Sequence, residues 1–271
     1  MRNFDVVIKN GTLVDPQRKQ ITVGHIGIRD GKIAAITRED IVGQQQLDAK
    51  LAVVCPGFID IHAHVDNGLI AAQGMARQGI TTTVGGNCGM GPADLQEFFQ
   101  PFTNGGFPIH QLMFIGESFA LRQKVGAIDP YKAATPQQIK DIVFLAEQAL
   151  EQGAVGISLG LEYAPGTTFA EVTAVSQVAA KYGKLVSIHT RQDGWPGLGG
   201  LKEAIKITQV TGAAVQVSHL VYMLGMGMMD ETVRILDEAV DSGLDITADS
   251  GLYHAFSTYI GSAVFDDGCI E

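Results

Sequence analysis

Two histidines that lie two residues apart are the first residues in the chain whose spacing could support catalysis. His62 and His64 follow the largely apolar run 58–61. Residues i and i+2 of a strand point to the same face. Both imidazoles would therefore project together from a strand end, where they could hold one metal ion. Two histidines in a polar loop are the alternative that this pair alone leaves open.

Three further residues with metal-binding side chains follow predicted strands. His189 and His219 each end a β-branched run, and Cys88 lies in the glycine-rich loop 85–89. A single histidine at a strand end is usually a polar residue with its hydrogen bonds satisfied, and a free cysteine is commonly a buried structural thiol. The recurrence of such placements at the predicted strand ends favours a metal site.

The mixture of imidazole and thiolate indicates the metal. These ligands suit Zn²⁺, although nickel, cobalt and iron accept them too. Five ligands exceed one tetrahedral set, so we expect one tight zinc site with ligands to spare for a second, weaker one, and Cys88 could bridge the two. A metal with an open coordination position lowers the pKa of bound water toward ~7 and polarises a carbonyl group. That chemistry is hydrolysis, most naturally of an amide.

Strand and helix patterns alternate from residue 58 onward and predict an α/β fold. Repeated βα units indicate a parallel sheet, and their number favours a TIM-like (β/α)8 barrel. A closed barrel needs eight strands, so we expect this one to be incomplete at the C-terminus. The expected helices are 136–152, 170–182, 201–211 and 230–242. The seven expected strands are 58–62, 80–85, 110–115, 154–159, 184–189, 214–219 and 244–248.

The first 55 residues are expected to form a separate all-β unit. Short strand-like runs alternate there with turn signals, of which Asn10-Gly11 and Asp30-Gly31 are the clearest. We therefore predict two domains, a small β portion at 1–55 and the barrel at 56–271.

Composition narrows the class of protein. A net charge of −10 without a basic cluster argues against nucleic-acid binding. No apolar run reaches the length of a membrane span, and no secretory signal is recognisable at the N-terminus. The three cysteines are far apart, which does not suggest a disulfide framework. We expect a cytoplasmic protein that acts on a small molecule.

The sequence resembles the amidohydrolase superfamily and, within it, the N-acyl-D-amino-acid deacylases, or D-aminoacylases. The segment 56–64 matches the superfamily's first-strand signature, and the loop Asn87-Cys88-Gly89 is similar to that of the deacylase branch. Further similar segments are 158–166, 188–191 and 217–220.

The resemblance implies a fold, an activity and a division of the ligands. Residues 1–55 would be half of a small β-sandwich domain that flanks the barrel. His189, His219 and Cys88 would hold the tight zinc ion, and His62 and His64 would serve the weaker site. The activity implied is hydrolysis of the amide bond of an N-acyl-D-amino acid or a related small amide.

The family's general base is an Asp of the eighth strand, which this sequence does not include. Asp66 and Asp249 are the candidates within the chain for that role. Tyr253 and Ser257 fall where the family has residues near the substrate. Arg191 is a candidate cation for a substrate carboxylate.

Other interpretations remain open. A cyclic amidase or deaminase on the same barrel usually carries a carboxylated lysine in the fourth strand, and the run 154–159 has none. A catalytically incomplete fragment that only binds metal is a further alternative, and it would favour oligomerisation or pairing with a missing C-terminal segment. Glu162 is either a solvated loop carboxylate or a contact for a substrate amine or the metal.

Overall fold

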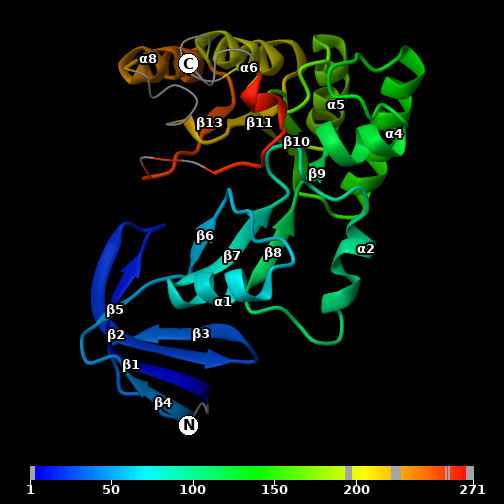
Figure 1. Ribbon diagram of the computed structural model, residues 1–271. Helices are drawn as coiled ribbons and strands as arrows, with labels where there is room; N and C mark the ends of the chain where they lie inside the picture. Colours follow the sequence, from blue (N-terminus) through cyan, green and yellow to red (C-terminus); the bar gives the residue numbers. More distant parts are fainter. Residues whose placement is uncertain (1–3, 193–196, 221–226, 254, 256, 267–271) are drawn as a thin grey trace. The chain divides into compact units, whose positions relative to one another are not determined.

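The computed structural model describes residues 4–192, 197–220, 227–253, 255 and 257–266 (Figure 1). The chain divides into two compact units, Met1–Phe58 and Ile59–Glu271.

The first unit is a single five-stranded sheet. Its strands follow the order β3-β2-β1-β4, and β5 also pairs with β1. The β1–β2 and β2–β3 pairs are antiparallel, whereas β4 and β5 run parallel to β1. The strands are β1 (Phe4–Asp15), β2 (Gln20–Arg29), β3 (Lys32–Thr37), β4 (Gly43–Asp48) and β5 (Val53–Val54).

The expected turn at Asn10-Gly11 is wrong, because β1 continues through both residues. Its pairing with β2 shifts register between Ile8 and Gly11, which marks a β-bulge. Asn10 adopts a φ of 55°, a conformation that asparagine tolerates better than most residues. A Cβ at Gly11 would lie 2.8 Å from Val54 Cγ2, so glycine is required there for close packing.

The second unit alternates parallel strands with helices, as the sequence predicts. The seven expected strands are confirmed within the described residues, with one of them split at Phe114 into β8 and β9. The chain forms one sheet of order β6-β7-β8 and another of order β13-β12-β11-β10-β9. The strands are β6 (Phe58–Asp60), β7 (Ile80–Gly85), β8 (His110–Met113), β9 (Ile115–Gly116), β10 (Gly156–Gly160), β11 (Leu185–His189), β12 (Ala214–Val217) and β13 (Ile246–Ala248).

Helices cover the outer face of the larger sheet, where α5 packs against β10 and β11, α6 against β12, and α8 against β13 (Figure 1). None of the described helices is long and apolar enough to cross a membrane. The longer helices are α1 (Leu69–Arg77), α4 (Pro136–Glu151), α5 (Phe169–Lys181), α6 (Gly197–Thr211) and α8 (Met229–Asp241). The short ones are α2 (Leu95–Phe99), η1 (Gln100–Phe102), the π-helix η2 (Glu117–Leu121), α3 (Arg122–Lys124) and η3 (Ala263–Phe265).

The start of α4 shows how the sequence sets a helix boundary. Thr135 Oγ1 accepts a hydrogen bond from the Gln138 backbone N–H, and the Gln138 side chain accepts one from the Thr135 N–H. This capping box satisfies two backbone donors that the first helical turn leaves unpaired. Pro136 occupies the first helical position, where its missing N–H costs nothing.

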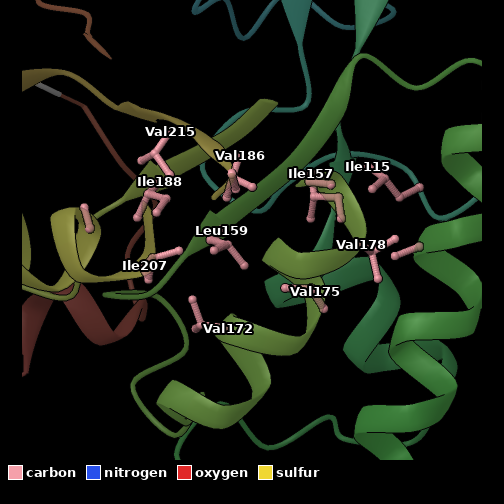
Figure 2. Close-up of a cluster of buried hydrophobic side chains, with 14 of the residues drawn as sticks. Ile115, Ile157, Leu159, Val172, Val175, Val178, Val186, Ile188, Ile207 and Val215 are labelled. Atoms are coloured by element: carbon pink, nitrogen blue, oxygen red, sulfur yellow. The ribbon is translucent and has the colours of Figure 1, made fainter. Parts of the chain in front are cut away.

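The main core lies between the larger sheet and its helices. Figure 2 shows Val172, Val175 and Val178 of α5 among strand residues such as Leu159 and Ile157. These side chains are all buried. Their burial fixes the strands in place, and with them the loops that leave the strand ends.

Truncation of Leu159 to alanine tests this core. We expect Leu159→Ala to lower the free energy of unfolding by about 2–5 kcal/mol, because it leaves a cavity in a packed interior. Ile70→Ala is the control, since Ile70 is exposed on α1 and should change stability by no more than about 0.5 kcal/mol. Urea unfolding followed by circular dichroism measures both. Equal effects of the two substitutions would contradict the assignment of Leu159 to the core.

Candidate metal centre

One thiol and three imidazoles converge at the C-terminal ends of the parallel strands. His62 and His64 follow β6, Cys88 follows β7, and His219 follows β12. Cys88 Sγ lies 3.4 Å from His62 Nε2, 3.8 Å from His64 Nε2 and 3.5 Å from His219 Nε2. The structure thus brings together residues that are up to 157 positions apart in the chain (219 − 62).

His189, the last residue of β11, completes the cluster. Its ring centroid lies 4.5 Å from that of His219. Two groups of three residues have ligand atoms within 4.8 Å of one another, namely His62 with His64 and Cys88, and Cys88 with His189 and His219. All five sequence-predicted ligands therefore lie in one cluster, and Cys88 belongs to both groups. This geometry can hold one metal ion, or two that share the thiolate.

The loop that carries Cys88 is held in an unusual backbone conformation. Cys88 has a φ of 57°, in the left-handed region that few residues other than glycine adopt. The buried Asn87 fixes the loop, because its side-chain amide donates to Val84 O at 2.9 Å and accepts from Ser187 Oγ at 2.9 Å. A Cβ at Gly160 would lie 2.2 Å from Cys88 O, so only glycine fits there.

Asp249, which follows β13, orients His62. Its Oδ2 lies 3.1 Å from His62 Nδ1 and accepts a hydrogen bond from Gln216 Nε2 at 2.6 Å. Its Oδ1 accepts from the His219 backbone N–H at 2.7 Å. Burial opposes ionisation of Asp249, but these hydrogen bonds outweigh it and lower the pKa of the carboxyl. Because an ionised carboxylate only accepts, His62 donates through Nδ1 and turns the lone pair of Nε2 toward Cys88.

Glu162, which follows β10, is hydrogen-bonded to His189 much as Asp249 is to His62. Its Oε2 lies 2.8 Å from His189 Nε2. His189 Nδ1 is buried and has no hydrogen-bond partner among the described residues. That nitrogen is therefore the one left to bind a metal.

His189, which is buried, and His219, which is partly buried, are suited to metal coordination. Burial, with a smaller effect of His189, lowers the pKa of His219 to about 2, so its ring is neutral near pH 7. Burial also lowers the pKa of His189, whereas the adjacent Glu162 carboxylate favours the protonated ring. Burial is the larger of the two effects, because the side chain of His189 is only 5% exposed. Neutral imidazole is the form that binds a metal.

Asp66 lies at the edge of the cluster. Its Oδ1 accepts a hydrogen bond from the Gly86 backbone N–H at 3.3 Å, and its φ is 39°. Burial raises the pKa of this carboxyl, although the Gly86 N–H and His64 partly offset that effect.

The three residues expected to bind substrate are either paired with another side chain or exposed. Arg191 forms two hydrogen bonds with Glu203, at 2.9 and 2.8 Å, so an acidic partner already neutralises its charge. Tyr253 is 78% exposed, and Ser257 is also exposed. No contact of these residues with the five clustered ligands occurs among the described interactions.

Sequence reasoning assigned no role to Asn87 or Gln216. Asn87 was part of a recognised motif, and its burial directly before Cys88 is what makes it a support for the loop. Gln216 alternates with buried apolar residues in β12, which could have marked it as pointing toward a polar centre. Glu162 and Asp249 were named without a partner, because pairs between distant strands cannot be derived from spacing alone.

Comparison with known proteins finds similarity to deacylases over most of the chain. No protein-family model matches it. It is 30% identical to a D-aminoacylase of Alcaligenes xylosoxydans xylosoxydans over 95% of its own length and 59% of that protein. An N-acyl-D-glutamate deacylase of Bordetella bronchiseptica, solved with zinc and a phosphonate inhibitor, superposes with a TM-score of 0.85 at 27% identity. That match covers 93% of this chain and 59% of the solved one. The chain is a D-aminoacylase homologue of the amidohydrolase superfamily.

This homologue spans about 59% of the length of the relatives it matches. A solved D-aminoacylase, described as having a binuclear metal centre, superposes with a TM-score of 0.81 at 27% identity over 92% of this chain and 59% of that one. An L-hydantoinase of Arthrobacter aurescens shares the fold, with a TM-score of 0.66 at 18% identity over 92% of this chain and 58% of that one.

Replacing the shared thiol tests the centre. We expect Cys88→Ser to weaken zinc binding by at least about 100-fold, since loss of a direct ligand should cost no less than loss of an outer partner. Cys55→Ser is the matched control, because Cys55 is a free, exposed cysteine and should bind zinc as the wild type does. Competition with a chromophoric chelator measures both affinities. Equal affinities for Cys88→Ser and wild type would remove Cys88 from the ligand set.

Asp249 provides a separate test of how His62 is oriented. We expect Asp249→Asn to weaken metal binding by about 10- to 100-fold, because the amide cannot supply the charge that fixes the imidazole. Asp241→Asn, on the exposed side of α8, makes the same change of charge away from the cluster. Isothermal titration with zinc separates the two, and equal affinities would show that Asp249 does not support the centre.

Proposed function

We propose that this chain is the metal-binding part of a zinc-dependent hydrolase that cleaves the amide bond of N-acyl-D-amino acids. The observation that carries the proposal is the approach of Cys88 Sγ to within 3.4–3.8 Å of three histidine nitrogens. Thiolate with imidazole is a ligand set that zinc accepts. The deacylases that match over nearly the whole chain support the choice of substrate.

The five ligands would divide into a tight and a weaker site. We assign His189, His219 and Cys88 to the tight site, because two of them are buried and His189 Nδ1 has no other partner among the described residues. His62 and His64 would serve the weaker site, since His64 is exposed. The compact unit that holds them would be the catalytic barrel domain, and the first unit would belong to a flanking β domain.

The residues around the ligands would prepare the site for amide hydrolysis. Zinc, when bound, supplies a Lewis acid and lowers the pKa of a bound water. Asp249 and Gln216 hold His62 in one tautomer, and Glu162 does the same for His189. Asn87 keeps the Cys88 loop in its left-handed conformation. Asp66, which lies at the edge of the cluster and whose pKa is raised by burial, is our candidate for the carboxyl that would exchange a proton with the reacting water.

A cyclic amidase of the same fold is less well supported. Such enzymes usually hold their two metals with a carboxylated lysine on the fourth barrel strand. The corresponding strand, β10, has the sequence Gly-Ile-Ser-Leu-Gly and offers no lysine. The similarity to hydantoinases is below 25% identity and concerns the fold alone.

Hydrolysis by the zinc-loaded chain tests the proposal. We expect release of free amino acid from N-acetyl-D-glutamate or N-acetyl-D-methionine, and little from the L enantiomers or from hydantoin. Cys88→Ser should lower kcat/KM by at least about 100-fold through loss of metal, whereas Cys55→Ser should leave it unchanged.

Two outcomes would reject the proposal. Faster turnover of hydantoin would favour the cyclic amidase. Stoichiometric zinc without turnover of any N-acyl-D-amino acid would mean that the chain by itself binds metal only.

A further inference from the structure

A cavity of about 330 Å³ lies in the second unit beside the metal cluster. Three segments line it: residues 118–131, which run from η2 through α3 into the loop that follows, Tyr163 in the loop after β10, and residues 259–263, which lead into η3. The residues that define its chemistry are Phe119, Arg122, Tyr131, Tyr163, Tyr259 and Ser262. A volume of this size is at the lower end of those that hold small ligands.

Aromatic rings make one wall of this cavity. The rings of Tyr163 and Tyr259 stack with centroids 5.7 Å apart and an interplanar angle of 13°, and Phe119 lies 5.9 Å from Tyr163. The ring of Tyr163 also contacts His189, with centroids 4.7 Å apart. One ring therefore links the cavity wall to a candidate zinc ligand.

One buried hydroxyl in the lining, that of Ser262, lacks a partner among the described residues. Ser262 is 6% exposed, and its Oγ has no hydrogen-bond partner among the described residues. It sits at the N-cap of η3 without capping it, although serine is a preferred capping residue. A buried hydroxyl without a partner costs free energy, so a ligand atom that pairs with it would bind favourably.

The charge at the cavity is balanced. Arg122 is almost fully buried and pairs with the buried Glu171 at 2.6 Å, while its Nη2 donates to Lys132 O at 2.7 Å. Glu117, also buried, has its pKa raised well above the usual range by burial and by the adjacent Glu171, which keeps it neutral. Arg122 and Glu171 therefore cancel, and the cavity offers no excess positive charge to an anion.

We infer that this cavity binds an uncharged aromatic or branched apolar group that carries one hydrogen-bonding atom. Such a group stacks on Tyr259 and pairs with Ser262 Oγ. On the proposed function, on which this assignment of the ligand rests, it is the acyl end of an N-acyl amino acid. The homologue should then prefer a bulky acyl group, such as benzoyl, to formyl.

Binding of benzamide to the metal-free protein tests the cavity without any need for hydrolysis. We expect Tyr259→Ala to raise the Kd about 2- to 13-fold through loss of ring stacking, and Ser262→Ala to raise it by a similar factor. Tyr259→Phe keeps the ring and should bind as the wild type does. Phe144→Ala removes an exposed aromatic ring of α4 away from the cavity and is the control. Benzoate should bind more weakly than benzamide.

Saturation-transfer NMR titration gives these constants, and two results would overturn the inference. One is an unchanged Kd in both Tyr259→Ala and Ser262→Ala, and the other is tighter binding of benzoate than of benzamide. The outcomes for hydrolysis are separate. Benzamide binding with the expected pattern but no hydrolysis would reject the proposed function alone. Hydrolysis without the pattern would reject the cavity alone.

Discussion

The approach of one thiol to three imidazoles is the constraint on which the second unit depends. Parallel strands have their carboxyl ends on the same side. The ligands at the ends of β6, β7, β11 and β12 can therefore meet at one point, provided that the strands keep their order in the sheets. The buried residues between the larger sheet and α5 hold the strands β10 and β11 in place. The core thus sets the positions of the strand ends that carry the ligands.

Three residues of the metal cluster and its surroundings have strained backbone conformations. Asp66, Cys88 and His219 all have positive φ, which is uncommon for residues other than glycine. Hydrogen bonds compensate in each case: the Gly86 N–H donates to Asp66, the Asn87 side chain of the cysteine loop donates to Val84 O, and the His219 N–H donates to Asp249. Such strain persists only where neighbouring groups fix the backbone. These hydrogen bonds therefore hold the backbone segments that carry the ligands.

Much of the second unit could be predicted from the sequence, because its signals are local. Apolar runs, capping residues and glycine stops predict the strands and helices, and histidine or cysteine at the ends of four of the seven runs predicts the ligands. Hydrogen-bond partners that follow strands of different sheets could not be predicted. Asp249 meets His62 across 187 positions, and no pattern in either segment encodes that distance. The turn expected at Asn10-Gly11 is wrong for another reason, because the same dipeptide occurs both in turns and in bulges. Here the bulge places Gly11 tightly against Val54.

The hydrogen bond between His62 and Asp249 has a mechanical consequence as well. β6 and β13 are the terminal strands of the two sheets, and the outer edge of each has no strand partner in the described part of the chain. Side chains, not backbone pairs, join these strands: Asp249 reaches His62 after β6 and is braced by Gln216 of β12. The hydrogen bond that orients His62 therefore also holds together the ends of two strands that no backbone pairing joins among the described residues.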